Sequence, residues 1–185
     1  WKFDVKLSDH VDVQAHRGGA GLWPENTFTS MTKATEMGVN TLELDLQISQ
    51  DGKVVVSHDA YFNSRYATRP DGSEVKSEDP KEYLYTMPYS TIAKYDVGKR
   101  PSPVWPGKEQ SPAIKPLATE LIDSVENYVE ANGLDPMRYN IEIKSRKGKD
   151  EGKNWPEYHE FVDKCMEVLL SKNLGDRLVV QCIDP

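Results

Sequence analysis

The sequence is poor in cysteine and has no long apolar run. Cys165 and Cys182 are its only cysteines, so a framework of several disulfides is excluded. We expect both to be buried free thiols, because unpaired cysteine is among the residue types most often buried. No apolar run approaches the roughly 20 residues that a helix needs to cross a bilayer. The sequence therefore predicts no transmembrane segment.

Positive charge is also scarce. Lysine and arginine number 23 against 30 aspartate and glutamate residues, which gives a net charge of -7. This balance argues against nucleic acid as a partner, although a single basic pocket can still hold one phosphate. With 185 residues, of which 37% are hydrophobic and 29% charged, the chain has an ordinary globular composition and enough length for one good-sized core.

What the sequence does contain is two polar clusters attached to apolar stretches. The first stretch ends abruptly in His-Arg-Gly-Gly at residues 16–19. The second, residues 41–47, alternates strictly, so that its three leucines face one way and Glu43 and Asp45 face the other. Two carboxylates side by side on a strand repel each other, and a divalent metal is the simplest cation to compensate them.

Hydrophobic periodicity and turn residues predict alternating strands and helices. The predicted strands cover residues 11–15, 41–48, 139–144 and 178–183, with a return strand at 54–56, and the predicted helices cover 24–37, 117–132 and 156–172. This order is typical of a parallel sheet with crossover helices. Active sites of such proteins lie at the carboxyl ends of the strands. Polar candidates gather at these ends: His16, Arg17, Glu43, Asp45, Glu142 and Lys144.

Residues 60–116 differ from the rest of the chain. They hold most of the prolines and many tyrosines, and they show no clean period. Because the stretch is too long for an ordinary loop, we expect an inserted subdomain or a lid. We therefore divide the chain into the start of an α/β unit at 1–59, the insertion at 60–116 and a continuation at 117–185. Residues 1–10 are mixed and polar, as in a loose entry segment.

Five short motifs resemble, in order, those of the glycerophosphodiester phosphodiesterase family. They are His-Arg-Gly at 16–18, Pro-Glu-Asn-Thr at 24–27, Glu-Leu-Asp at 43–45, Val-Ser-His-Asp at 56–59 and Glu-Ile-Lys at 142–144. The resemblance implies a (β/α)8 barrel, the TIM-barrel type within the α/β class, with an inserted subdomain after the second strand. It also implies metal-dependent hydrolysis of glycerophosphodiesters to glycerol 3-phosphate and an alcohol.

The resemblance further implies a role for each candidate side chain. The general acid and base would be His16 and His58, with His58 as the base in our interpretation. The attacking group would be the substrate's own glycerol 2-hydroxyl, by way of a cyclic phosphate. The ligands of one divalent cation would be Glu43, Asp45 and Glu142, and the phosphate contacts would be Arg17 and Lys144.

The residue types agree with this chemistry. A phosphodiester anion repels a nucleophile, so a metal and basic side chains that neutralise its oxygens stabilise the transition state. Three carboxylates form a hard oxygen site, which suits Mg²⁺ or Ca²⁺ better than Zn²⁺. Because imidazole is the side chain suited to proton transfer near neutral pH, two histidines can divide the proton transfers between them.

Simpler roles remain open for several of these residues. Glu43 and Asp45 can form the solvated face of an edge strand, and Lys144 can merely pair with a neighbouring carboxylate. Glu25 and Asn26 can be a first-turn charge and a helix cap.

Aromatic and histidine residues outside the motifs also have simpler roles. Trp23, Trp105 and the tyrosines of the insertion can form a wall for substrate or can pack the insertion. His10 and His159 have no motif around them, and we expect both at the surface.

The expected barrel is incomplete. A closed eight-stranded barrel typically needs about 200–250 residues, whereas four core strands and a return strand are predicted here. Either the chain is a piece of a longer protein or something else completes the barrel. An open half-barrel is expected to self-associate or to need a partner, because it leaves a strand edge unpaired.

Two other functions stay open. A related barrel phosphodiesterase acting on intact lipids, such as a sphingomyelinase D-like enzyme, would favour an exposed apolar rim in the insertion, whose first half is polar. A non-catalytic phosphate-binding module would lack a histidine or a metal ligand, and none is missing. A small-molecule glycerophosphodiester is therefore the expected partner. Because the chain starts at Trp1 and many relatives are secreted, a periplasmic or secreted location is favoured over the cytoplasm.

Overall fold

The computed structural model describes residues 11–183, so the predicted entry segment and His10 lie outside the described residues. Its strands form one sheet in the order β1-β2-β4-β5, and these four strands run parallel. A short strand, β3 (Val54–Val56), pairs antiparallel with β2. The parallel strands are β1 (Gln14–Ala15), β2 (Thr41–Ile48), β4 (Arg138–Ile143) and β5 (Leu178–Gln181).

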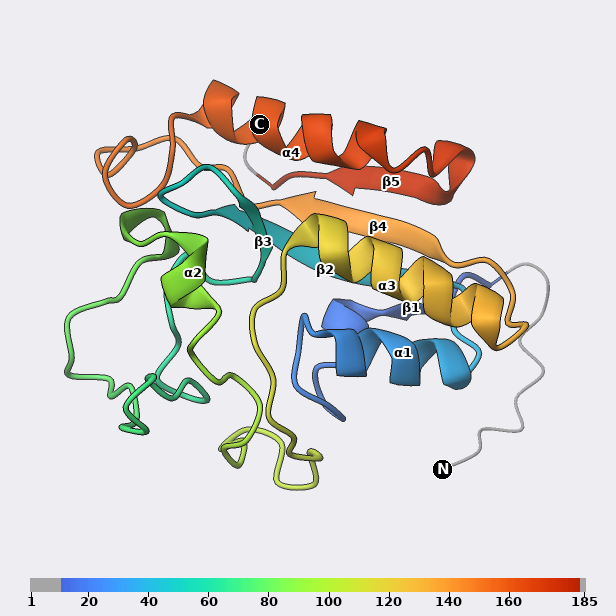
Figure 1. The fold of residues 1–185 in the computed structure, drawn as a ribbon, viewed down its shortest axis with the longest axis horizontal. Coiled ribbons are helices and arrows are strands. Elements are labelled where there is room, and N and C mark those ends of the chain that lie inside the picture. The colour runs from blue at the N-terminus through green and yellow to red at the C-terminus, as the bar shows by residue number, and fades with distance from the viewer. Residues whose placement is uncertain (1–10, 184–185) are drawn as a thin grey trace.

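Three helices cover one face of this sheet (Figure 1). They are α1 (Phe28–Glu36), α3 (Ala118–Ala131) and α4 (Tyr158–Ser171). Each helix turns one apolar side to the leucines of β2 and the isoleucines of β4, which together form the main hydrophobic core. The predicted α/β order of strands and crossover helices is therefore confirmed. No helix among residues 11–183 is long and apolar enough to span a membrane.

β2 is the central strand of the sheet, and both of its faces are buried. Its leucines pack against the helices, while Glu43 and Asp45 lie on the opposite, polar face, 6% and 1% exposed. The simpler reading of these two carboxylates as the solvated face of an edge strand is therefore wrong. β2 is also paired on both sides, by β1 and β4, so it is not an edge strand.

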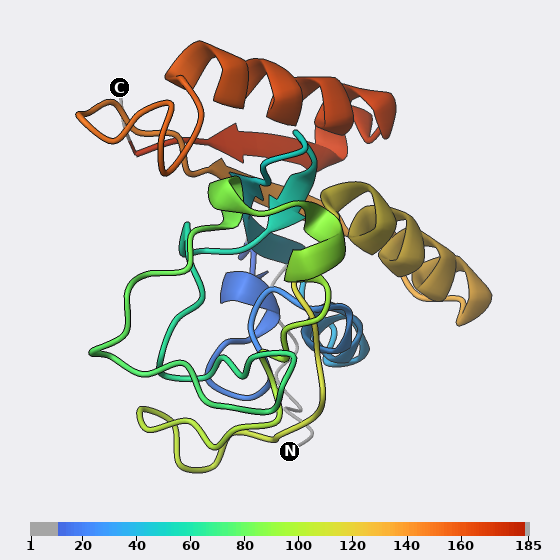
Figure 2. The same cartoon turned by 60° about the vertical axis from the view of Figure 1, so that its left-hand side comes forward.

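The chain between β3 and α3 lies beyond the carboxyl ends of the strands (Figures 1 and 2). It contains two short helical turns, η2 (Leu84–Thr86) and α2 (Tyr89–Ile92), and is otherwise irregular. It packs around a second hydrophobic cluster in which Phe62 stacks on Tyr95, with ring centroids 3.8 Å apart. This cluster fixes a long irregular segment over the polar edge of the sheet.

Three local expectations are wrong. β1 spans only Gln14–Ala15, because the Asn40 side chain accepts the hydrogen bond of the Val13 N–H in place of a neighbouring strand. Cys182 is exposed, since it follows the end of the edge strand β5, whereas Cys165 is buried in α4 as expected. The cap of α1 is Thr27, which exchanges hydrogen bonds with Ser30, and Asn26 is not the cap.

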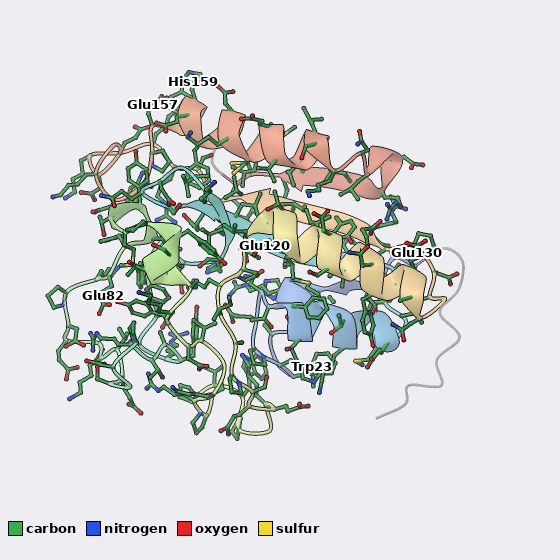
Figure 3. The ribbon with its side chains drawn as sticks, viewed as in Figure 1. Trp23, Glu82, Glu120, Glu130, Glu157 and His159 are labelled. Carbon is green, nitrogen blue, oxygen red and sulfur yellow. The ribbon has the colours of Figure 1, made fainter. Side chains whose placement is uncertain are left out.

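The histidine in α4 is at the surface, as expected. His159 is exposed and lies beside Glu157, which caps α4 by accepting hydrogen bonds from the first backbone N–H groups of the helix. Figure 3 shows both side chains at the outer end of α4, away from the polar edge of the sheet. His159 therefore takes no part in the site described next.

Candidate functional site

A strained turn carries the first motif. Residues His16–Gly18 form a single 3-10 turn, η1, in which Arg17 has left-handed backbone angles, φ 52° and ψ 34°. Such angles are unfavourable for a non-glycine residue by roughly 1–2 kcal/mol. Gly18 follows with φ 73°, and a Cβ there would lie 2.6 Å from Ser30 Oγ. Glycine is therefore required at position 18 by both conformation and packing.

Polar contacts hold the turn in this conformation. The Arg17 backbone N–H donates to Glu43 Oε2 at 2.6 Å, and the Arg17 carbonyl accepts from the Asn26 N–H at 2.9 Å. The guanidinium contacts Glu25 through Nη1 at 3.1 Å. Its Nε is buried, lies 3.5 Å from Asp45 Oδ2 and makes no hydrogen bond. Arg17 thus connects the turn to two strand carboxylates, to Glu43 by a hydrogen bond and to Asp45 by an ion pair.

Three buried carboxylates meet on the polar face of the sheet. Asp45 and Glu142 are register partners on β2 and β4, and with Glu43 they bring carboxylate oxygens within 4.8 Å of one another. The Asn26 side chain fixes Asp45, donating to Oδ2 at 2.9 Å and accepting from the Asp45 N–H at 3.3 Å. Lys144 Nζ lies 2.7 Å from Glu142 Oε1 and 3.6 Å from Asp45 Oδ1.

Negative charge is in excess at this cluster. Burial, together with the charge of Asp45, raises the pKa of Glu43 to about 7. Three carboxylates face only two cationic side chains, Arg17 and Lys144, so one negative charge lacks a counter-charge there. An oxygen-only donor set with surplus negative charge is what Mg²⁺ or Ca²⁺ requires. The residues present therefore fit a divalent cation.

The second histidine is held by a carboxylate. His58 Nδ1 lies 3.1 Å from Asp59 Oδ1, and Asn63 donates to Asp59 Oδ2 at 2.7 Å. Burial alone would raise the pKa of Asp59, but these hydrogen bonds and the charge of Lys115 lower it to about 2. The resulting anion favours the tautomer of His58 that carries its proton on Nδ1. That tautomer leaves Nε2 able to accept a proton.

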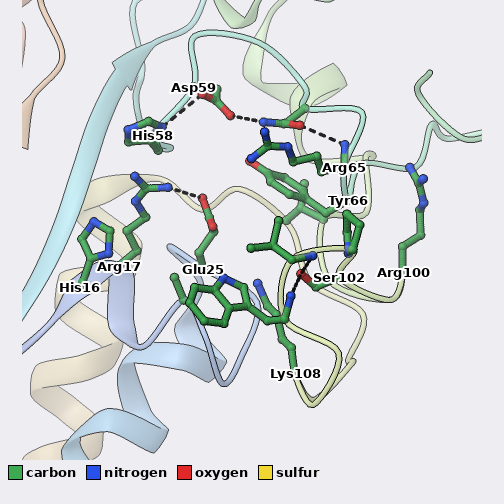
Figure 4. Close-up of a pocket in the computed structure, with 17 residues that line it drawn as sticks. His16, Arg17, Glu25, His58, Asp59, Arg65, Tyr66, Arg100, Ser102 and Lys108 are labelled. Carbon is green, nitrogen blue, oxygen red and sulfur yellow. Dashed lines mark hydrogen bonds and ion pairs between the residues drawn. The ribbon is translucent and has the colours of Figure 1, made fainter. Parts of the chain in front are cut away.

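A cavity of about 360 Å³ joins the two histidines. Its inner wall includes His16, Arg17 and His58, and its outer wall comes from residues 63–108 of the segment between β3 and α3 (Figure 4). The outer wall includes Tyr66 and Trp105. This is the size of a small-molecule site, and the polar groups that converge on its inner wall can bind an anion.

The structure separates the predicted site residues into two adjoining groups. His16, Arg17 and His58 line the cavity, whereas Glu142 and Lys144 line a neighbouring cavity of about 370 Å³ beside β5. Glu43 and Asp45 lie between the groups, since Arg17 contacts both and Lys144 lies near Asp45. One polar network therefore connects five of the seven candidates: Arg17, Glu43, Asp45, Glu142 and Lys144.

The aromatic residues divide between the two roles left open for them. Trp105 is 52% exposed and lines the cavity with Tyr66. Trp23 instead packs beside Gly19 and under Lys33, whose Nζ lies 5.7 Å from the ring centroid. Tyr95 packs inside the segment between β3 and α3. Only some of these aromatic side chains therefore belong to the wall of the cavity.

Sequence reasoning missed several residues of the site. Asn26 orients Asp45, Glu25 binds Arg17, and Asp59 orients His58. All three belong to the quoted motifs, so the motifs marked these positions. The residue types alone did not show which side chain each of them contacts. Lys115, which is buried and donates to Ser57, belongs to no motif, and only its place before Pro116 in a largely apolar stretch could have drawn attention to it.

Comparison with known proteins agrees with the geometry. A sequence model described as the glycerophosphoryl diester phosphodiesterase family matches residues 16–185. Lysophospholipase D of Homo sapiens is 32% identical over 165 residues, which cover 86% of this chain and 48% of that protein. A phosphodiesterase of Oleispira antarctica, solved in complex with its product sn-glycerol-3-phosphate, is 28% identical with a TM-score of 0.62, over 93% of this chain and 56% of that one.

A solved structure from Silicibacter pomeroyi is similar in fold, with a TM-score of 0.79 at 23% identity, over 94% of this chain and 58% of that chain. These likenesses confirm the predicted barrel class, with the barrel incomplete in this chain. The chain spans about half the length of the relatives it matches.

Proposed function

Because the chain belongs to the glycerophosphoryl diester phosphodiesterase family, we propose that the whole protein hydrolyses glycerophosphodiesters to glycerol 3-phosphate and an alcohol. The observation that carries this proposal is the meeting of three buried carboxylates with a turn that presents a histidine and an arginine to a cavity. His58 lies on the same cavity. A phosphodiester needs charge neutralisation and two proton transfers, and these groups can provide both.

Glu43, Asp45 and Glu142 would hold one divalent cation, Mg²⁺ or Ca²⁺. When bound, the cation would neutralise phosphate oxygens as negative charge develops on them. The raised pKa of Glu43 supports this assignment, because a bound cation would remove the charge repulsion that contributes to the rise. Asn26 would keep Asp45 in place by its two hydrogen bonds, whether or not the cation is bound.

Arg17 and Lys144 would contact the substrate phosphate. The position of Arg17 on the wall of the cavity that also holds both histidines supports the first assignment, because a guanidinium there can contact a phosphate oxygen. Lys144 is 10% exposed at its side chain and already contacts two of the carboxylates. Its ammonium would therefore bridge the carboxylate cluster and the phosphate.

The two histidines would divide the proton transfers. His58, oriented by Asp59, would take the proton of the glycerol 2-hydroxyl as its oxygen bonds to phosphorus. His16 would give a proton to the oxygen of the leaving alcohol as its bond to phosphorus breaks. Water would then open the resulting cyclic phosphate to glycerol 3-phosphate, so that one water is consumed for each diester bond cleaved.

The test is hydrolysis of glycerophosphocholine by the whole protein, followed by ³¹P NMR. We expect glycerol 3-phosphate to appear with Mg²⁺ or Ca²⁺ and to stop appearing with EDTA. His16→Ala, His58→Ala and Glu142→Gln should each lower kcat by about 100-fold or more. Glu130→Gln, at an exposed position of α3, serves as the matched control. Hydrolysis that continues unchanged in EDTA would refute the metal, and no product under either condition would refute the reaction.

Lysophospholipids are a second candidate class of substrate. Val104 and Trp105 lie on the cavity and are each 52% exposed, so the second half of the segment provides an apolar rim for an acyl chain. The lysophospholipase D name of the human relative points the same way. Release of choline from lysophosphatidylcholine, compared with release from glycerophosphocholine, distinguishes the two classes. Trp105→Ala should slow only the lysolipid reaction if the rim holds the chain.

A further inference from the structure

The side chain of Lys115 is buried next to the His58–Asp59 pair, and the proposed chemistry gives it no role. Lys115 is 4% exposed. Its Nζ donates to Ser57 Oγ at 2.6 Å and lies over the rings of Phe62 and Tyr66, 5.6 and 5.7 Å from their centroids. This ammonium forms no salt bridge within 4 Å to any carboxylate of the described residues. A buried ammonium in such surroundings lowers folding stability.

Hydrogen bonds connect Lys115 through Ser57 to the backbone of Asp59, whose side chain contacts the histidine. The Ser57 hydroxyl accepts from Lys115 and donates its own proton to the Asp59 carbonyl at 2.7 Å. The Asp59 carboxylate in turn holds His58 Nδ1 at 3.1 Å. Because the single proton of Ser57 is already committed to Asp59, Lys115 must be the donor in its own contact. The ammonium therefore supports the orientation in which the Ser57 hydroxyl donates to Asp59.

The electrostatic contacts point in the same direction. Asp59, Glu25 and Asp45 attract the ammonium, and Arg17 repels it. Desolvation outweighs this attraction and lowers the pKa of Lys115 to about 8, so it is still largely protonated near neutral pH. Its charge contributes to the low pKa of Asp59. Asp59 is thereby kept as an anion even though burial disfavours the charge.

We propose that Lys115 is a positioning residue for His58: through Ser57 and Asp59 it fixes the turn at residues 57–59 and keeps the imidazole proton on Nδ1. Lys115 itself touches no reacting atom. The inference rests on the proposed function for its effect on rate, but the state of His58 can be measured independently of activity. Unlike His16, Arg17 and His58, Lys115 does not line the cavity.

The test compares Lys115→Met with Lys94→Met, a matched change at an exposed lysine of the same segment. In the whole protein we expect Lys115→Met to lower kcat by about 10-fold or more while KM changes less than about twofold. Ring ¹⁵N NMR of His58 should show a loss of the Nδ1-protonated tautomer. The melting temperature should stay the same or rise, because a desolvated charge is replaced by an apolar side chain.

Ser57→Ala removes the hydroxyl that connects Lys115 to Asp59. It should reproduce the loss in kcat and the tautomer change, and the double variant should be no slower than Lys115→Met alone, since the two residues act in one chain. A purely structural lysine would give a lower melting temperature with an unchanged His58 tautomer, and that result would overturn the proposal. If the wild-type protein hydrolyses no diester, the proposed function fails while the tautomer measurement still decides the role of Lys115.

Discussion

Two non-glycine residues with left-handed backbone angles hold the carboxylates of the site. Arg17, at φ 52°, directs its backbone N–H to Glu43, and Asn26, at φ 57°, directs its side chain to Asp45. Strained angles of this kind persist where the surrounding contacts determine them, often at functional sites. Here the two residues also bond to each other through the Asn26 N–H and the Arg17 carbonyl.

Replacing Asn26 tests how far this support matters. Asn26→Gly keeps the left-handed backbone available but removes both contacts to Asp45. We expect the affinity for Mg²⁺ or Ca²⁺ to fall about 10–100-fold, the usual effect of losing a residue that orients a metal ligand. Isothermal titration calorimetry measures the change. Asn173→Gly is the control, because Asn173 has φ 51° and lies after α4, away from the site. Equal affinities in the two variants would contradict the supporting role.

The raised pKa of Glu43 predicts a pH dependence of stability in EDTA. Its folded-state pKa, about 7, lies above its ordinary value of 4.5, so between these two values the folded state binds more protons than the unfolded state. The free energy of unfolding should therefore fall as pH rises from about 4.5 to 7, by about 3 kcal/mol at most. Urea unfolding at several pH values measures this. Glu43→Gln should remove most of the slope, and saturating Mg²⁺ should reduce it.

At the residue scale, the motifs predicted side chains that the structure brings together, but not the contacts that hold them. Glu43 and Asp45 could be found because strict alternation with leucine is visible in the sequence. Lys115 could not, because its partner Ser57 is 58 residues away and the contact depends on the fold between them. Contacts of this range are set by tertiary packing and leave no local pattern.

Among the elements, β2 was predictable and β1 was not. The residues of β2 alternate over its full length, and the predicted bounds agree with Thr41–Ile48. The apolar run before residue 16 predicts a longer β1, but the Asn40 side chain takes the hydrogen bond that would extend it. The segment between β3 and α3 has no period because its packing depends on scattered aromatic and aliphatic residues around one small cluster.

The turn between β1 and α1 should tolerate no side chain at Gly18. Gly18→Ala combines an unfavourable φ of 73° with a Cβ 2.6 Å from Ser30 Oγ. Gly38→Ala, after α1, has a similar φ of 81° but open space around the Cβ. We expect Gly18→Ala to be the more destabilising by about 1–3 kcal/mol, the usual effect of overpacking. Chemical denaturation of both variants measures this difference. Equal losses of stability would show that the backbone conformation alone, and not the contact with Ser30, causes the destabilisation.

At the scale of the whole molecule, β5 is an edge strand, since no other strand among residues 11–183 pairs with its outer side. Val179 and Val180 are 47% and 39% exposed, and Ile183 beyond the strand is 82% exposed. An apolar parallel strand with one side unpaired is a site of association between sheets. The open edge agrees with the predicted half-barrel. Closing the barrel needs further strands, which the described residues do not provide.

Residues 1–185 produced by themselves should associate through this edge. Sedimentation velocity should show species larger than the 21.0 kDa monomer whose fraction grows with concentration. Val180→Lys should shift the distribution toward monomer, because a charge at a strand edge opposes pairing. Leu170→Lys, which removes an exposed apolar side chain from α4 instead, should change it little. A monomer at all concentrations would contradict the prediction.

The two walls of the cavity have different freedom to change over evolutionary time. The inner wall stands on β1 and β3, whose residues also support the main core, so a substitution there disturbs the barrel. The outer wall belongs to a segment with its own small cluster of apolar residues. Its cavity-facing side chains, such as Trp105, can vary while the carboxylates and histidines stay in place. Under the proposed function, a different leaving group can therefore be accommodated by exchanging a single stretch of chain while the residues beneath it stay unchanged.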